Sequence, residues 1–193
     1  EPNRHIRPQG QDFNNGDTLL YPPLRLDPRH IGLLAAADYP WVQVYQKPRV
    51  AILSTGDEIV MPGAPRSIAQ SVSANGPALS AFVENHGGLP VNFGIVPDDE
   101  TSLTTLANVS KDCDLIVTSG GVSVGDRDLV RKAFSNAGLE VGFHRIAMRP
   151  GKPLMFGHLD DTPVLGLPGN PVSAMVCAML FVSTALERLQ GLP

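Results

Sequence analysis

The sequence predicts a three-layer α/β fold built on a mostly parallel sheet, with helices covering both faces. From residue 49 onward, short apolar runs typical of buried strands alternate with segments typical of helices. Three of the strand-like runs end in turns rich in glycine and small hydroxyl residues, at residues 54–58, 118–125 and 166–171. Because the turns that follow parallel strands gather at one edge of a sheet, we expect a ligand site there.

The first 46 residues differ from the rest of the chain. Their many prolines leave room only for short elements. Asp27 and Pro28 predict the N-cap and first residue of a short helix that continues through residue 37, and Val42 and Val44 predict an edge strand. We therefore expect a small amino-terminal segment at residues 1–46 and a separate domain at residues 47–193.

Within that domain, turn and cap signals divide the chain into alternating elements. Asp98 or Asp99 is expected to cap one helix, and Asn170 to cap the last one. The expected strands cover residues 50–54, 89–96, 114–118, 141–148, 154–156 and 164–165. The expected helices cover residues 74–85, 100–109, 126–137 and 171–189.

Bulk properties narrow the range of functions. The net charge of −4 argues against a large nucleic-acid footprint. Cys113 and Cys177 belong to no CxxC pair, so we expect buried free thiols rather than a zinc site, and a reducing compartment such as the cytoplasm. The longest apolar stretch, residues 172–186, is shorter than a bilayer span and contains hydroxyl residues, so we expect a buried helix and no membrane contact.

The three glycine-rich turns have the chemistry of a phosphate or oxyanion cradle. Without a Cβ, backbone N–H groups can approach a ligand closely, and small hydroxyls add further donors. The residues that we expect to contact a ligand in these turns are Thr55, Gly56, Asp57, Ser119, Gly120, Gly121, Ser123, Gly125, Pro168, Gly169 and Asn170.

Acidic residues stand next to two of the expected site segments. Asp98 follows a predicted strand directly, and if it is not the helix cap it suits Mg²⁺, which takes carboxylates together with phosphate oxygens. Asp126 and Asp128 follow the longest glycine turn, where they either stabilise a helix start or join a metal site. Both interpretations stay open on the residues alone.

Three cations lie close together in a chain that is acidic overall. Arg145 and Arg149 are four residues apart on a predicted strand, so we expect them to share one face, and Lys152 follows in a Pro-Gly-Lys-Pro turn. Such a group suits an oxyanion or phosphate clamp, although solvent-exposed charges would give the same pattern.

Residues 121–125 also match the G-x-S-x-G pattern of a nucleophile elbow. A serine hydrolase would need an acid and then a histidine later in the chain. His144 and His158 are the histidines that follow, and both lie in or beside predicted strands. This disfavours a hydrolase.

Four motifs in order resemble the molybdopterin molybdenumtransferase family, which includes bacterial MoeA and the E domain of gephyrin. They lie at residues 49–58, 118–126, 148–153 and 166–174. The stretch at residues 6–12 and the helix from residue 31 are similar to the family's amino-terminal region as well. Full members carry further amino-terminal sequence and a carboxyl-terminal domain. The resemblance implies a molybdopterin-binding, MogA-like domain at residues 47–193, after the tail of the amino-terminal region.

The resemblance also implies an activity. Such enzymes take adenylyl-molybdopterin and molybdate as substrates, with Mg²⁺, and yield molybdenum cofactor and AMP. It implies metal-binding roles for Asp98 and Asp128, a further functional acid in Asp12, and molybdate contacts for Arg145 and Arg149, where relatives often have lysine. Lys152 is expected either to have a structural role or to screen phosphate. A homodimer and an adenylyltransferase as a partner follow for the full-length protein.

Two other functions remain open at this point. A gephyrin-like scaffold or binding module uses the same fold, and a molybdopterin adenylyltransferase uses the same type of domain. The segment with Asp12 and the turn at residues 149–152 favour molybdenum insertion.

Overall fold

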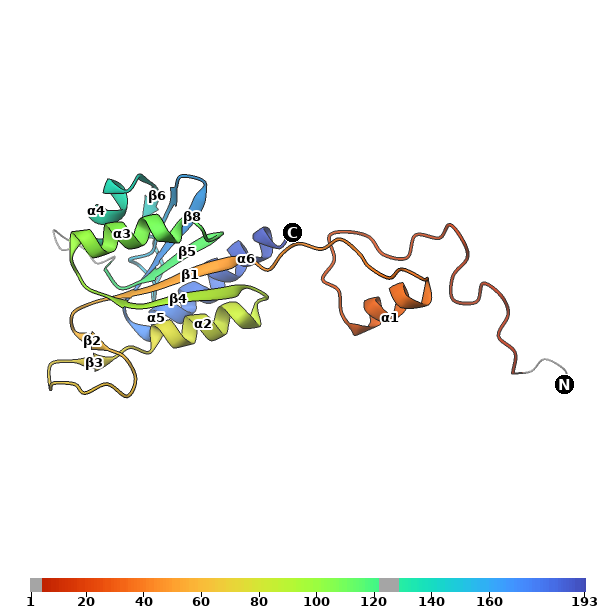
Figure 1. The fold of residues 1–193 in the computed structure, drawn as a ribbon, viewed down its shortest axis with the longest axis horizontal. Coiled ribbons are helices and arrows are strands. Elements are labelled where there is room, and N and C mark those ends of the chain that lie inside the picture. Colours follow the sequence, from red (N-terminus) through yellow and green to blue (C-terminus); the bar gives the residue numbers. More distant parts are fainter. Residues whose placement is uncertain (1–4, 122–128) are drawn as a thin grey trace. The chain divides into compact units, whose positions relative to one another are not determined.

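The computed structural model describes residues 5–121 and 129–193. The chain divides into two compact units (Figure 1). One comprises Glu1–Tyr45 with Gly191–Pro193, and the other comprises Gln46–Gln190. Because the site candidates lie mainly in the second unit, its sheet determines how they are brought together.

A six-stranded sheet forms the centre of the larger unit, with strand order β4-β1-β5-β8-β7-β6. The first four strands in this order are mutually parallel, and β7 is antiparallel to both β8 and β6. The predicted mostly parallel sheet is thus confirmed. The strand bounds are β1 Arg49–Thr55, β4 Leu89–Val96, β5 Leu115–Ser119, β6 Leu139–His144, β7 Met155–Leu159 and β8 Thr162–Leu167.

Helices cover both faces of the sheet, as Figure 1 shows. Successive residues of β1 point to opposite faces: Val50 and Ile52 belong to one core cluster, Ala51 and Leu53 to the other. The first cluster lies under α2 (Asn75–Asn85) and the last helical run, and the second under α3 (Glu100–Ser110) and α4 (Leu129–Asn136). Being buried on both faces explains why β1 and β5 are continuous apolar runs.

The last helical run consists of α5 (Pro171–Cys177), the π-helical turn η1 (Ala178–Val182) and α6 (Ser183–Leu189). Among the described residues it is the one helix whose 19 residues, with a mean hydropathy of 1.6, are long and apolar enough to cross a membrane. The expected helix at residues 171–189 is thus confirmed, whereas the judgement that the apolar stretch at residues 172–186 is too short to span a bilayer does not hold for the whole run. One stripe of this run is fully buried in the domain core and comprises Ala174, Cys177, Ala178, Val182 and Leu186.

Several element boundaries differ from the prediction. β6 ends at His144, so Arg145 and Arg149 are not on a strand and the prediction that they share a strand face is wrong. Arg145 instead has a φ of 72°, a conformation incompatible with a continuing strand. β7 and β8 extend beyond the predicted runs, because they pair as a hairpin. A two-stranded parallel ladder of β2 (Ile59–Val60) and β3 (Ser71–Val72) was not predicted, since two-residue strands carry no periodic signal.

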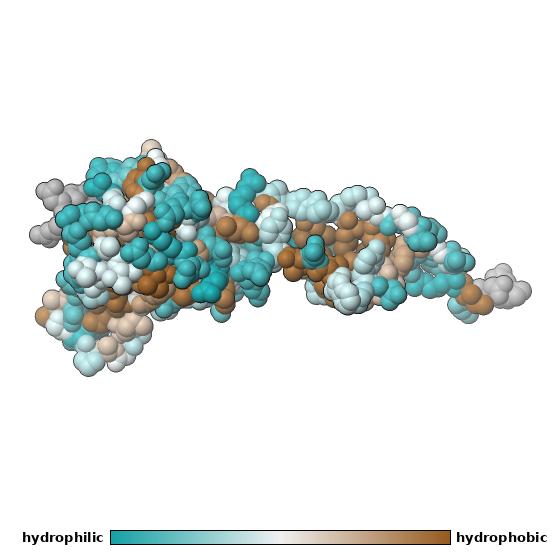
Figure 2. All heavy atoms as spheres, turned by 45° about the horizontal axis from the view of Figure 1, so that its top comes forward, coloured by the Kyte–Doolittle hydropathy of each residue, from teal (hydrophilic) through white to brown (hydrophobic). Residues whose placement is uncertain are grey.

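The smaller unit contains α1 (Pro28–Ala36), and residues 42–44 do not form the expected edge strand. Asp27 caps α1 as predicted, accepting hydrogen bonds from the backbone of Arg29 and His30. No α1 residue is buried. The unit's exposed apolar side chains include Ile31 and Val44, and Figure 2 shows brown, hydrophobic surface over this part of the chain.

Candidate functional site

The three glycine-rich turns meet at the carboxyl edge of the parallel strands. The N–H of Gly120 donates to the carbonyl of Leu167 over 3.3 Å, which joins the turn after β5 to the end of β8. A Cβ on Gly169 would lie 3.6 Å from the Cα of Gly120, so these two turns are in van der Waals contact. The sequence prediction that separate turns converge on one edge agrees with this geometry.

Gly120 also determines how closely the turn after β5 approaches β1. Its φ is +91°, and a Cβ would lie 2.5 Å from the backbone oxygen of Thr55. Gly121, with φ +65°, would bring a Cβ within 2.8 Å of the Thr55 hydroxyl. No side chain fits between these backbones, which explains the double glycine.

Asn75, the first residue of α2, ties the turns together from the side. Its Nδ2 donates to the Ser119 hydroxyl over 2.6 Å and to the carbonyl of Gly169 over 2.8 Å. The sequence analysis included Asn75 only within the expected helix at residues 74–85 and gave it no role in the site. A polar residue that begins a helix directly above the carboxyl edge of the sheet is the signal that could have identified it.

This edge holds buried polar atoms that have no partner among the described residues. They are Ser54 Oγ, Thr55 Oγ1, Asn75 Oδ1, Asp98 Oδ1, Thr118 Oγ1 and His144 Nε2. Ser54, Thr55 and Thr118 are at the ends of β1 and β5, Asn75 begins α2 and Asp98 follows β4, whereas His144 ends β6 at the far side of the sheet. Buried polar groups in folded proteins are nearly always paired, so the atoms of Ser54, Thr55 and Asn75, which line one cavity, offer hydrogen-bonding capacity that a ligand can use.

A cavity of about 260 Å³ opens at the same place. The ends of β1 and β5, the turn after β8 and the start of α2 line it, with Ile59 and Val72 of the two-stranded ladder. Four of the expected contact residues thus face the same cavity: Thr55, Ser119, Gly120 and Gly169. Glu58, which the sequence analysis did not single out, adds a carboxylate to the lining.

The two adjacent acids after β4 have different environments. Asp99 caps α3 by accepting a 2.8 Å hydrogen bond from the N–H of Ser102. Hydrogen bonding from the Ser102 side chain, and then from its backbone, lowers the carboxyl pKa of Asp99. Asp98 turns toward the site, and burial, followed by the charges of Asp57 and Glu58, raises its carboxyl pKa. The backbone N–H of Asp98 lies 3.4 Å from Asp57 Oδ1, which brings the acids after β1 and β4 together.

These acids are suited to a divalent cation only in part. Asp98 has a carboxylate oxygen with no partner in the described part of the chain, and it lies beside the charges of Asp57 and Glu58, which a cation would neutralise. However, no group of three metal-ligating side chains occurs within residues 5–121 and 129–193. Mg²⁺ commonly takes one or two carboxylates and completes its coordination shell with phosphate oxygens and water, so these acids could hold Mg²⁺ only together with a phosphorylated ligand.

Four of the expected site residues lie outside the described residues: Ser123, Gly125, Asp126 and Asp128.

The basic residues lie in the loop between β6 and β7. Met155 pairs with Gly166, so this loop leaves the sheet at the same edge as the turn after β8. Gly151 is buried, and a Cβ there would meet the Cys177 sulfur at 2.8 Å, so the loop packs on α5. Arg145, Arg149 and Lys152 are exposed.

The remaining turn residues, Pro168 and Asn170, precede α5, and Asn170 caps this helix by accepting a hydrogen bond from the N–H of Ser173.

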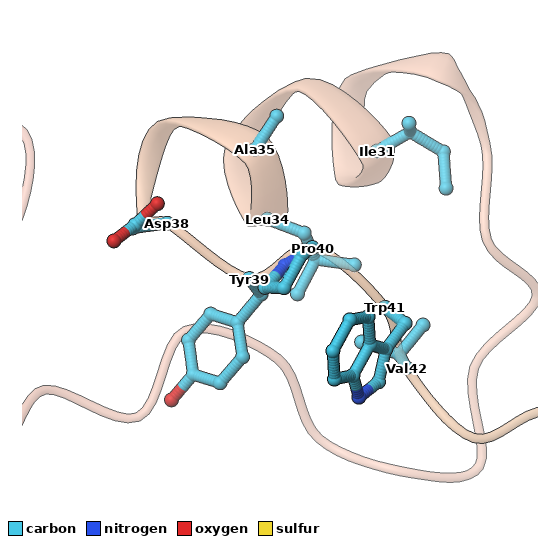
Figure 3. Close-up of a pocket in the computed structure, with 8 residues that line it drawn as sticks. All are labelled: Ile31, Leu34, Ala35, Asp38, Tyr39, Pro40, Trp41 and Val42. Atoms are coloured by element: carbon cyan, nitrogen blue, oxygen red, sulfur yellow. The ribbon is translucent and has the colours of Figure 1, made fainter.

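Asp12 belongs to the smaller unit, where it pairs with Arg7, and both side chains are exposed. This unit has a cavity of its own, of about 380 Å³, beside α1. Figure 3 shows the rings of Tyr39 and Trp41 on the same side of the helix, with Ile31 and Leu34 nearby. Its lining is mostly apolar and has few polar groups that could orient a ligand, in contrast to the edge of the sheet.

The free thiols are where the sequence analysis expected them. Cys113 and Cys177 are both buried and unpaired by any disulfide. Burial raises the pKa of both thiols, so they are protonated and inert at neutral pH.

Fold and site together define an α/β domain with a polar cavity at the carboxyl edge of its sheet. The comparisons with known proteins make this class specific. The model of the family described as a probable molybdopterin binding domain matches residues 51–188, and the chain belongs to this family.

Its relatives extend over nearly the whole chain. A molybdopterin molybdenumtransferase from Nostoc sp. is 39% identical over 100% of this chain and 45% of its own length. The one from Haemophilus influenzae is 36% identical over 99% of this chain and 47% of its own length. A gephyrin from Dictyostelium discoideum is 36% identical over 99% of this chain and 30% of its own length. The resemblance to molybdopterin molybdenumtransferases is thus confirmed, and the chain spans less than half the length of these relatives.

Solved structures agree. A molybdopterin biosynthesis MoeA protein from Pyrococcus horikosii superposes with a TM-score of 0.77 at 37% identity, over 87% of this chain and 42% of that chain. A molybdenum cofactor biosynthesis protein B superposes with a TM-score of 0.55 at 16% identity, over 77% of this chain and 96% of that chain. The second likeness shows the shared fold alone.

Proposed function

We propose that the full-length protein inserts molybdenum into adenylyl-molybdopterin and releases AMP. The observation that carries this proposal is the convergence of the three glycine-rich turns on a cavity where the buried Ser54 and Thr55 hydroxyls have no partner among the described residues. Backbone N–H groups and hydroxyls arranged in this way suit the pyrophosphate link between AMP and the pterin phosphate. Relatives named molybdopterin molybdenumtransferase support the choice of substrate.

Magnesium is part of the proposal. Asp98 and Asp128 would hold Mg²⁺ with phosphate oxygens of the substrate, and the ion would neutralise negative charge that develops when the phosphate link breaks. Asp98 supports this role because its buried carboxylate oxygen is unpaired beside Asp57 and Glu58.

The loop that carries Arg145, Arg149 and Lys152 supplies the opposite charge. We propose that the two arginines hold molybdate and that Lys152 screens phosphate, because all three are exposed in a loop at the edge that carries the cavity. A guanidinium offers a planar fork of donors to an oxyanion. Asp12 would add a further acid to the active site of the assembled protein.

The remaining elements of the proposal concern the whole protein. It would act as a homodimer in the cytoplasm, and it would receive its adenylylated substrate from an adenylyltransferase. It would require neither nucleic acid nor a membrane.

The test of the metal assignment uses acid variants of the full-length protein. Asp98→Ala and Asp128→Ala should abolish Mg²⁺-dependent release of AMP from adenylyl-molybdopterin. The control is Asp112→Ala, which removes an exposed carboxylate before β5, at the opposite edge of the sheet, and should leave turnover unchanged. Normal turnover in both test variants would refute the assignment.

A second measurement tests the oxyanion clamp. Arg149→Ala should raise the molybdate concentration needed for half-maximal turnover by roughly tenfold, because a charge-assisted contact is lost. Arg188→Ala removes an exposed arginine at the end of α6 and serves as the matched control. An equal molybdate requirement in both variants would remove Arg149 from the site.

Incubation with molybdopterin and ATP separates the proposal from its alternative. Formation of adenylyl-molybdopterin would indicate an adenylyltransferase instead.

A further inference from the structure

The hydrogen bond that Asn75 donates to Ser119 determines the direction in which the Ser119 hydroxyl points in the cavity. We propose that Asn75 is a positioning residue that presents the Ser119 O–H as a hydrogen-bond donor to a phosphate oxygen of the ligand. This inference rests on the proposed function, because it assigns one contact of the same site.

The orientation of the Asn75 amide follows from its two partners. The Gly169 carbonyl can only accept a hydrogen bond, so the group that faces it at 2.8 Å must be the amide nitrogen. The same nitrogen lies 2.6 Å from the Ser119 oxygen. Both amide protons are therefore used, and the Ser119 oxygen accepts one of them.

This leaves the proton of Ser119 free to point elsewhere. A serine hydroxyl has one proton and two lone pairs, and here one lone pair is occupied by Asn75. No described residue accepts the Ser119 proton in a hydrogen bond. Ser119 is 2% exposed yet lines the cavity, so the cavity is where an acceptor can meet this proton.

The surroundings of Asn75 make the arrangement rigid. Its side chain is about nine-tenths buried at the start of an 11-residue helix, and its second partner is backbone rather than a mobile side chain. The would-be Cβ of the next residue, Gly76, lies 3.3 Å from the Ser54 hydroxyl, so α2 begins in close contact with β1. A donor that is fixed before the ligand arrives costs little reorganisation on binding.

The chemistry of the neighbouring groups indicates an acceptor-rich ligand. The hydroxyls of Ser54 and Thr55 also lack partners among the described residues, and each can donate. Together with Ser119 they supply three hydroxyl donors at the ends of two adjacent strands. A phosphate group has several acceptor oxygens and matches such a set.

A double-mutant cycle tests the inference, with inorganic pyrophosphate as the probe and the dissociation constant measured by calorimetry on the full-length protein. Ser119→Ala should weaken binding by roughly ten- to hundredfold, the range expected for a hydrogen bond to a charged group. Asn75→Ala should weaken binding similarly. If Asn75 acts through Ser119, the double variant should bind about as weakly as Ser119→Ala alone.

A nearly isosteric variant checks the direction of the hydroxyl without leaving a cavity. Asn75→Asp puts an acceptor where the donor stood, so the Ser119 proton would turn toward the new carboxylate and away from the ligand. Binding should fall at least as much as with Asn75→Ala. Asn85→Asp makes the same charge change at the exposed end of the same helix and should bind nearly normally.

The outcomes separate this inference from the proposed function. Pyrophosphate binding by the unsubstituted protein, with losses that multiply in the double variant, would overturn the inference alone. Unchanged binding by Ser119→Ala would also overturn it, whether or not the Asn75 variants fold. If the unsubstituted protein binds no pyrophosphate, both this inference and the proposed function fail.

Discussion

The two edges of the six-stranded sheet differ in whether their polar side chains have hydrogen-bond or ion-pair partners. At the amino edge, Asp114 accepts a 2.7 Å hydrogen bond from the N–H of Arg49, and Lys111 forms a 2.8 Å ion pair with Asp160. At the carboxyl edge, Ser54, Thr55 and Asp98 have buried oxygens without partners among the described residues. The polar groups at the amino edge bond to other parts of the domain, whereas those at the carboxyl edge can still form hydrogen bonds with a ligand.

The difference has an energetic meaning. A hydrogen bond made within the folded chain contributes about 1 kcal/mol to stability, whereas a buried polar group left unpaired costs about 1–3 kcal/mol. The carboxyl edge therefore lowers the stability of the domain in return for binding, as expected of functional sites. Removing a paired polar group at the amino edge should therefore lower the free energy of unfolding, whereas removing an unpaired one at the carboxyl edge should raise it.

The largest effect is expected where backbones touch at the carboxyl edge. Gly120→Ala should destabilise the domain by about 2–5 kcal/mol, since the new Cβ combines a left-handed conformation with a 2.5 Å approach to the Thr55 oxygen. Gly94→Ala is the control, because Gly94 also has a positive φ but nothing within 4 Å of a Cβ, and it should cost about 1–2 kcal/mol. Urea denaturation measures both, and equal losses would contradict the close approach.

An intermediate effect is expected at the amino edge. Asp114→Ala removes the acceptor for the Arg49 N–H and should lower the free energy of unfolding by about 1 kcal/mol. Pyrophosphate affinity should not change, because no ligand group reaches this edge in the proposed site. Asp112→Ala, an exposed neighbour, should change neither quantity. Weaker pyrophosphate binding by Asp114→Ala would contradict the expectation that only the carboxyl edge contacts the ligand.

The smallest effect, and the one with the opposite sign, is expected at Asp98. Its folded pKa is raised above the unfolded value, so this group favours folding less as the pH rises through the unfolded and then the folded pKa. Above both pKa values the charge is a net cost. Asp98→Asn should therefore raise the melting temperature at pH 7 by about 1–3 °C.

Asp99 provides the contrast within two residues. Its folded pKa is lowered by the capping bonds, so its contribution is present above the unfolded pKa and is lost as the pH falls through the folded value. Asp99→Asn should leave stability almost unchanged, since asparagine also caps helices well. Calorimetry at pH 7 compares the two variants, and a lower melting temperature for Asp98→Asn would contradict the unpaired state of that carboxyl.

Much of the fold was determined by local sequence signals. The continuous apolar runs at residues 50–54 and 114–118 specify strands buried on both faces, and alternate residues of β1 do face different core clusters. Asp27 and Asn170 cap the helices that they were expected to cap, because side-chain capping depends on the next three residues only. The convergence of the turns followed from parallel strand order.

Other features depended on contacts between distant parts of the chain. The sequence left both Asp98 and Asp99 as candidates for the cap, and the fold separated them by turning Asp98 toward Asp57. Arg145 left its predicted strand because the loop that follows packs on α5. The role of Asn75 depends on partners 44 and 94 positions away, so its place at a helix start could mark it as a candidate but could not reveal those partners.

By itself, the sequence determined the alternation of strands and helices, the caps and the glycine turns, since each depends on neighbouring residues. Tertiary structure decided which polar groups at the carboxyl edge find partners and which stay unpaired. The physical reason is that hydrogen bonds between turns depend on distances of a few ångströms, and packing of the sheet and helices determines those distances.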